Sequence, residues 1–86
     1  MSQLDIKHQL LTTLRMTEGR PLLEEVMIAQ SNSRLSPRPT KADYDDAITA
    51  LRSDGYILCE ENEMEPENPY WVLEDKGIAY CKRKGL

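Results

Sequence analysis

The chain has 86 residues, of which 40% are hydrophobic and 30% are charged, and its formal net charge is −4. These values are typical of one globular domain, residues 1–86, and exclude a disordered or fibrous chain. No apolar run approaches the ~20 residues that cross a bilayer, and Asp5 stands where a secretory signal would be basic. We therefore expect a cytoplasmic protein without a membrane partner. Cys59 and Cys81 form neither a disulfide framework nor a zinc pattern.

The first half of the chain begins with helical patterns. Ser2 is a predicted N-cap with Asp5 three residues later, and an apolar stripe predicts a helix over 3–17 with its C-cap at Gly19. Pro21 either opens a second helix, over about 22–31, or holds a short extended segment before it. The prolines that follow make 33–39 a loop.

The second half predicts a helix, a hairpin and a final helix. Thr40 with Asp43 predicts the start of a helix that ends near residue 54 and whose apolar stripe has i, i+3, i+4, i+7 spacing. Strand formers at 56–59 and 70–73 enclose a Glu-rich tract with two prolines, which predicts a loop between two strands. A short terminal helix is expected over about 75–84, with basic residues in its last turn.

Charge is distributed unevenly along the chain. Residues 1–41 contain six basic and four acidic side chains, net +2, whereas residues 42–86 contain five basic and eleven acidic ones, net −6. The acidic density is highest in the tract between the two strands, and the basic residues Lys82, Arg83 and Lys84 follow near the end. A charged partner would therefore recognise local patches and not the net charge.

Two motifs resemble those of a known superfamily. The segment Leu51-Arg52-Ser53-Asp54-Gly55-Tyr56-Ile57 is similar to the junction between the third helix and the first wing strand of winged helix-turn-helix domains. Trp71-Val72-Leu73-Glu74-Asp75-Lys76-Gly77 is similar to the W-x-L-T-x-x-G signature that follows, with Glu74 in place of Thr. The resemblance covers about residues 3–84. It implies an α+β winged helix with a three-helix core, a two- or three-stranded wing sheet (wing about 55–73) and a short terminal helix. The segment 31–39 is longer than the usual helix-turn-helix turn of 3–4 residues.

Many winged-helix proteins lay the third helix in the DNA major groove and the wing along the phosphates. The positions of the third helix that point away from its apolar stripe are Ala42, Asp43, Asp45, Asp46 and Thr49. Three of these five are carboxylates, whereas bases are usually read by Arg, Lys, Asn or Gln. The Glu-rich wing also has the wrong sign for phosphate contact. Local charge therefore opposes the usual docking on DNA.

Two functional hypotheses remain. The first is a non-catalytic module that binds a protein with a basic surface through the acidic wing and third helix, using Asp45, Asp46, Glu60, Glu61, Glu63, Glu65, Glu67 and Trp71. The alternative is a DNA-binding protein of the transcription-regulator type, with contacts from Arg34, Arg38, Lys41, Thr49, Lys82, Arg83 and Lys84. The same residues also fit a plainer interpretation, in which scattered cations maintain solubility and the acidic loop shields a sheet edge.

Catalysis and cofactors are not expected. His8, the only histidine, has no orienting partner in the sequence, and the Glu-rich tract lacks the ligand pattern of a calcium loop. We predict no enzyme activity, no metal site and no cofactor. The first helix has more apolar residues than one narrow stripe needs, which indicates a second covered face, against either the terminal helix or another subunit. The resemblance to winged-helix proteins likewise implies a homodimer as one option.

Overall fold

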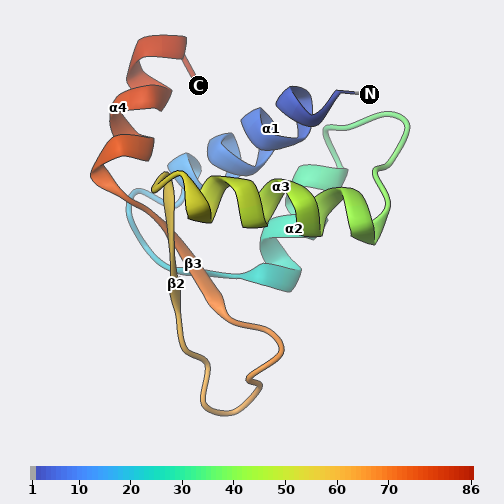
Figure 1. Ribbon diagram of the computed structural model, residues 1–86, viewed down its shortest axis with the longest axis vertical. Coiled ribbons are helices and arrows are strands. Elements are labelled where there is room, and N and C mark those ends of the chain that lie inside the picture. The colour runs from blue at the N-terminus through green and yellow to red at the C-terminus, as the bar shows by residue number, and fades with distance from the viewer. Residues whose placement is uncertain (1) are drawn as a thin grey trace.

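The computed structural model of the protein describes residues 2–86, which form a small α+β domain (Figure 1). The element order is α1 (Gln3–Met16), β1 (Leu22–Leu23), α2 (Glu24–Asn32), α3 (Lys41–Ser53), β2 (Ile57–Glu60), β3 (Tyr70–Leu73) and α4 (Asp75–Lys84). The three strands form one antiparallel sheet in the order β1-β3-β2. Helix α1 packs against all three other helices and against β3, and so lies at the centre of the fold.

Helix α1 agrees with the expected helix 3–17 to within one residue. The Ser2 hydroxyl accepts a hydrogen bond from the backbone N–H of Asp5, as the capping pattern predicted. The expected C-cap at Gly19 is wrong, because the helix is capped at Thr17. The Thr17 hydroxyl donates to the carbonyl of Leu14, and Gly19, with φ 89°, lies in the turn that follows.

The segment after Pro21 is extended before it becomes helical. Leu22 and Leu23 pair with Trp71 and Tyr70 of β3, so α2 begins two residues later than the expected range 22–31. Two roles were left open for Pro21, and the structure shows that it precedes a short extended segment and does not open the helix. The first residue of α2 is thus determined by pairing with a strand almost fifty residues away, which no local pattern in the sequence could predict.

Helix α3 has the predicted start and the predicted core face. Thr40 and Asp43 form a reciprocal capping box at its N-terminus. All four residues of the apolar stripe are buried, namely Tyr44, Ala47, Ile48 and Leu51. Leu35, in the loop between α2 and α3, packs into the hydrophobic core and is only 9% exposed. The eight residues between these helices thus form an anchored connection.

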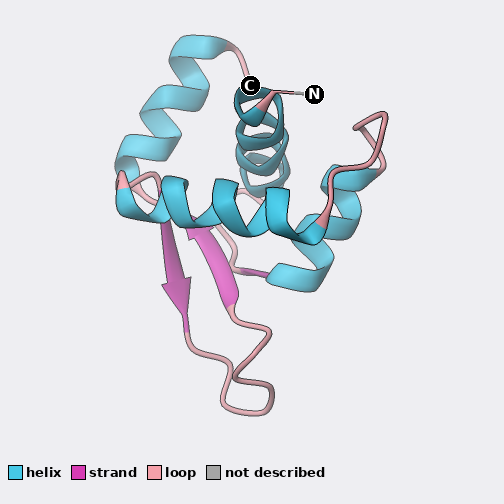
Figure 2. Cartoon of the chain, turned by 45° about the vertical axis from the view of Figure 1, so that its right-hand side comes forward, coloured by secondary structure: helices cyan, strands magenta, loops and turns pink. Residues whose placement is uncertain are grey.

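The hairpin and α4 complete the domain. The first hairpin strand is Ile57–Glu60, one residue later than expected, and β3 matches the expected 70–73. The β2–β3 hairpin extends away from the helices (Figure 2). Helix α4 has the expected bounds and ends at Gly85, which adopts a left-handed conformation with φ 71°. No buried side-chain nitrogen or oxygen within residues 2–86 lacks a hydrogen-bond partner.

Candidate functional site

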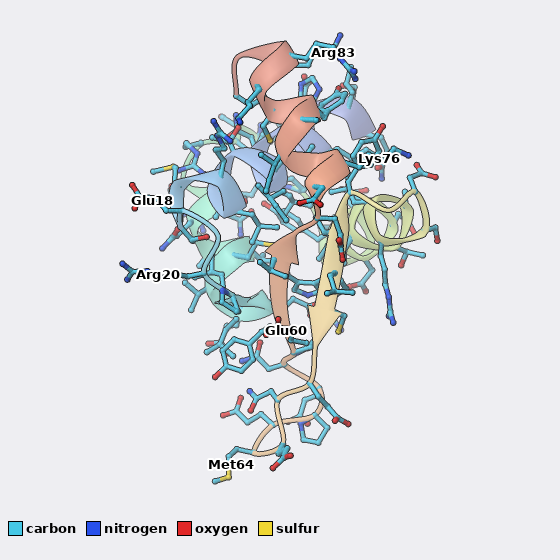
Figure 3. All side chains as sticks on the ribbon, turned by 90° about the vertical axis from the view of Figure 1, so that its left-hand side faces the viewer. Glu18, Arg20, Glu60, Met64, Lys76 and Arg83 are labelled. Carbon is cyan, nitrogen blue, oxygen red and sulfur yellow. The ribbon has the colours of Figure 1, made fainter. Side chains whose placement is uncertain are left out.

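The acidic loop, which we define as residues 60–69, comprises the last residue of β2 and the connection to β3 at the far end of the hairpin. Glu60 pairs with Tyr70 in the last register position of the two strands, and the chain then leaves the sheet. Figure 3 shows Glu60 where the loop begins and Met64 at its tip, far from the helices. The loop is thus presented to solvent by two strands whose other ends are held in the core by Ile57 and Leu73.

Hydrogen bonds around Asn68 fix the base of the acidic loop. The Asn68 side-chain amide donates to a carboxylate oxygen of Glu65 at 3.3 Å, and its backbone N–H donates to the Glu65 carbonyl at 2.9 Å. The Asn62 amide donates to the Asn68 carbonyl at 3.0 Å. The Asn68 side-chain oxygen accepts from the backbone N–H of Glu25, at the start of α2, at 3.0 Å. These bonds hold the loop against α2.

The charges of the acidic loop all have one sign. No Lys or Arg occurs within residues 60–69, and all five glutamates are exposed, namely Glu60, Glu61, Glu63, Glu65 and Glu67. Carboxylates at this density repel one another and attract cations, and the effect is screened by salt. The loop therefore has the chemistry to contact ammonium or guanidinium groups, and it opposes phosphate.

The outer face of α3 is also exposed but carries a more balanced charge. Asp45, Asp46 and Thr49 are exposed, as expected. The carboxylate of Asp43 accepts from the backbone N–H of Thr40 at 3.0 Å, so its role is in the helix cap. Arg52, one turn beyond Thr49, adds a positive charge to this face. The acidic loop, and not α3, is thus the strongly negative part of the surface.

A hollow of about 530 Å³ lies between α3, the start of α2 and β3, and we call it the α3–β3 hollow. It brings together Asp45, Thr49 and Trp71. Trp71, expected on the interface, is instead a core residue with 4% exposure. Strand alternation left open which face of β3 is buried, and the packing of the helices puts the Trp71 face inside.

Two charged residues of the α3–β3 hollow, Glu24 and Arg52, were not predicted as site residues from the sequence. The carboxylate of Glu24 accepts a hydrogen bond from the indole N–H of Trp71 at 3.0 Å. The guanidinium of Arg52 lies 5.9 Å from the centre of the Trp71 ring, a cation–π geometry. Arg52 follows Asp45 and Thr49 at helical spacing, which is a usable signal. Glu24 comes from α2, and only the tertiary structure brings it there.

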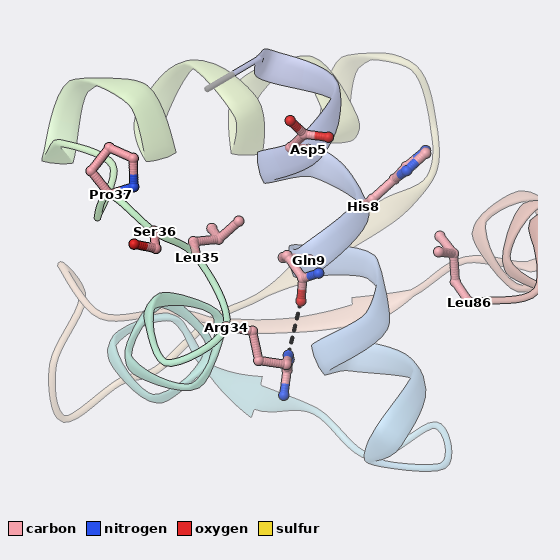
Figure 4. Close-up of a pocket in the computed structure, with 8 residues that line it drawn as sticks. All are labelled: Asp5, His8, Gln9, Arg34, Leu35, Ser36, Pro37 and Leu86. Carbon is pink, nitrogen blue, oxygen red and sulfur yellow. Dashed lines mark hydrogen bonds between the residues drawn. The ribbon is translucent and has the colours of Figure 1, made fainter.

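The basic residues expected to contact DNA do not form one patch. Arg34 is bound to α1: its Nε donates to the Gln9 side-chain oxygen at 2.8 Å (Figure 4), and its guanidinium also donates to the Thr13 hydroxyl. Arg38 and Lys41 are exposed beside the N-terminus of α3. The basic tail of α4, Lys82, Arg83 and Lys84, lies on the other side of the molecule (Figure 1).

Two further side chains with reactive chemistry are those of His8 and Cys81. A ring nitrogen of His8 shares a hydrogen bond with the Tyr80 hydroxyl at 2.7 Å. Burial raises the pKa of the Cys81 thiol, and the charge of Arg15 offsets this only in part. A raised pKa opposes thiolate formation. Within residues 2–86, no three His, Cys, Asp or Glu side chains are grouped so as to hold a metal ion, and no helix is long and apolar enough to span a membrane.

Comparison of the chain with protein-family models finds no match. Comparisons with curated proteins and with solved structures also find none.

Proposed function

We propose that this protein is a non-catalytic interaction module of the winged-helix type, which binds a partner protein with a basic surface. The acidic loop, in the position of the wing, supplies the main contact, and the exposed residues Asp45 and Asp46 of α3 supply a second one. The order of helices and strands, with a hairpin that projects beyond α3, is compatible with this fold type. The raised pKa of the Cys81 thiol supports a non-catalytic role for this residue.

The observation that carries the proposal is the acidic loop itself. Five exposed carboxylates occur there without a cation, on a loop whose base is fixed to α2 by Asn68. Because the loop is held before a partner arrives, less conformational entropy is lost on binding than with a free tail. Its charge favours encounter with a basic surface and rejects polyanions.

The DNA-binding alternative depends on cations that are separated in space. Arg34 is hydrogen-bonded to α1, and Arg38 and Lys41 lie beside the N-terminus of α3, whereas the basic tail lies at the end of α4. A duplex approaching α3 in the usual way would also meet the acidic loop. This alternative predicts binding that weakens by orders of magnitude between ~50 and ~200 mM salt.

The test compares two fluorescent probes, a Lys/Arg-rich peptide and a random duplex, by anisotropy at ~50 and ~200 mM salt. The peptide is expected to bind, and the duplex is not. Glu61→Gln/Glu63→Gln should weaken peptide binding by about 2- to 30-fold, since each exposed ion pair contributes ~0.2–1 kcal/mol. The matched control Glu18→Gln/Asp75→Asn removes the same charge outside the loop and should have little effect.

Either of two results would contradict the proposal. Equal loss of peptide affinity in both double variants would mean that the peptide responds only to net charge. Salt-sensitive duplex binding that survives in Glu61→Gln/Glu63→Gln and is lost in Arg83→Gln/Lys84→Gln would establish the DNA-binding alternative.

A further inference from the structure

A second surface, at the opposite end of the molecule, has the reverse character of the acidic loop. It is a hollow of about 180 Å³ between α1 and α4, here called the α1–α4 hollow. Its lining is largely apolar and aromatic: Leu4, Lys7, His8, Leu11, Leu51, Asp54, Tyr56 and Tyr80. An apolar cavity of ~150 Å³ accommodates benzene, so this hollow has room for one apolar side chain.

The walls of the α1–α4 hollow are ordered by contacts among its rings. Tyr80 shares a hydrogen bond with His8 at 2.7 Å. The rings of Tyr56 and Tyr80 meet edge to face with centroids 5.4 Å apart. Leu4, at the rim, is 55% exposed although it belongs to an otherwise well-packed helix. The hollow is therefore preformed and has an exposed apolar rim.

Cations lie beside the two tyrosine rings of this hollow. Lys76 Nζ lies 4.6 Å from the centre of the Tyr56 ring. The guanidinium of Arg83 and the Nζ of Lys84 lie 5.4 and 5.9 Å from the centre of the Tyr80 ring. Lys7 lines the hollow directly. The lining itself contains one cation, Lys7, and one carboxylate, that of Asp54, so the three cations beside its tyrosine rings give the site its positive charge. An occupant with an apolar anchor and flanking acids therefore fits it best.

The chain itself contains such a segment. Met64, at the tip of the acidic loop, is 91% exposed and has Glu63 and Glu65 as its neighbours (Figure 3). A methionine side chain is flexible and makes favourable contacts with aromatic rings, which makes it a suitable occupant of a hollow lined by two tyrosines. A methionine this exposed has no packing role in its own molecule.

We propose that the acidic loop of one copy docks in the α1–α4 hollow of a second copy, with Met64 as the anchor. Figure 3 shows Met64 at the opposite end of the molecule from Lys76 and Arg83, so the two surfaces cannot meet within one chain. The inference rests on the proposed function, since it names a basic partner for the loop. It also assigns a role to the basic tail that involves no DNA.

The contact joins two different surfaces and therefore propagates head to tail. Each copy keeps a free loop at one end and a free hollow at the other, which generates open chains or rings. One loop in one hollow buries a small area, so the association is weak and transient. Its strength falls as salt is added, because the charged groups are exposed.

Sedimentation velocity over a range of protein concentrations, at ~50 and ~300 mM salt, tests this prediction. The weight-average sedimentation coefficient should rise with concentration at low salt and stay at the monomer value at high salt. Met64→Ala should abolish the rise at low salt. The matched control is Met16→Ala, which removes another exposed methionine, 63% exposed and outside both surfaces, and should leave the rise unchanged.

A charge-exchange experiment distinguishes specific docking from a folding defect. Glu61→Lys/Glu63→Lys/Glu67→Lys changes the charge of the loop from −5 to +1 and so gives a basic loop beside a basic hollow. Arg83→Glu/Lys84→Glu gives an acidic hollow beside an acidic loop. Each variant alone should remain monomeric. An equimolar mixture should associate at least as strongly as the original chain, because every loop then finds a hollow of opposite charge. A mixture that stays monomeric, or a variant that associates alone, overturns the inference.

The outcomes separate this inference from the proposed function. If the original chain is monomeric at all concentrations but its loop still binds the Lys/Arg-rich peptide, self-association is wrong and the proposed function stands. If neither binding occurs, both are wrong. If the basic tail binds the random duplex and loop variants have no effect on self-association, the tail is a nucleic-acid contact and the docking model is overturned.

Discussion

Replacing Gly77 with alanine tests how closely α4 packs against the entrance to the hairpin. Gly77 lies in the first turn of α4, and a Cβ atom at this position would lie 2.2 Å from the carbonyl oxygen of Tyr56. That oxygen belongs to the backbone and cannot rotate away. It also accepts a hydrogen bond from the Glu74 N–H at 3.0 Å. The start of α4 must therefore move, and the Glu74 hydrogen bond is strained with it.

The expected free-energy change follows from three contributions. Overpacking costs about 1–3 kcal/mol, and weakening of the Glu74–Tyr56 hydrogen bond costs about 0.5–1.5 kcal/mol. The higher helix propensity of alanine offsets about 0.8–1.0 kcal/mol of this loss in unfolding free energy. The net loss of unfolding free energy is about 2 kcal/mol, which lowers the melting temperature of a domain this size by about 8–16 °C.

Thermal unfolding followed by far-UV circular dichroism measures this change directly. The control is Ala79→Gly at an exposed position of the same helix, where only propensity acts and a loss of about 1 kcal/mol is expected. Helix propensity alone would make Gly77→Ala more stable than the original chain. An unchanged or higher melting temperature for Gly77→Ala would therefore refute the close approach of α4 to Tyr56.

Two further predictions concern α3. Thr40→Ala removes the hydroxyl of the capping box with Asp43 and should cost about 1 kcal/mol in urea unfolding, whereas Thr40→Ser should cost much less. Burial raises the pKa of the Tyr44 phenol above its ordinary value of 10.0, and the charge of Arg38 lowers it by a smaller amount. The folded state then keeps the phenol proton where the unfolded state has lost it, so stability should fall above pH ~10. The difference in unfolding free energy between the original chain and Tyr44→Phe should shrink as pH rises, and a constant difference would contradict this.

Local sequence patterns were sufficient to predict those features that depend only on residues within one helix or loop. The capping box of Thr40 and Asp43 and the apolar stripe of α3 depend on residues within two turns of one another, so their outcome could be predicted from spacing. The single-sign charge of the acidic loop is likewise a property of ten consecutive residues. It could be recognised before any fold was known, because a polar loop between strands stays at the surface.

The tertiary structure decided everything that depends on contacts between distant segments. Helix α2 begins two residues later than the sequence pattern predicted because Leu22 and Leu23 pair with β3. The packing of helices on one sheet face made Trp71 a core residue, although strand alternation left both faces open. The side chain of Arg34 is held against α1 by hydrogen bonds to Gln9 and Thr13, which are more than twenty positions away in the sequence.

The same division applies to the two surfaces that we propose for binding. The sequence alone identified an acidic loop and a basic tail. The separation of these two features to opposite ends of the molecule, and the aromatic hollow that Tyr56 and Tyr80 form beside the tail, arise from the packing of α4 on α1. Tyr56 and Tyr80 are more than twenty positions apart in the sequence, so no local sequence pattern could predict their contact.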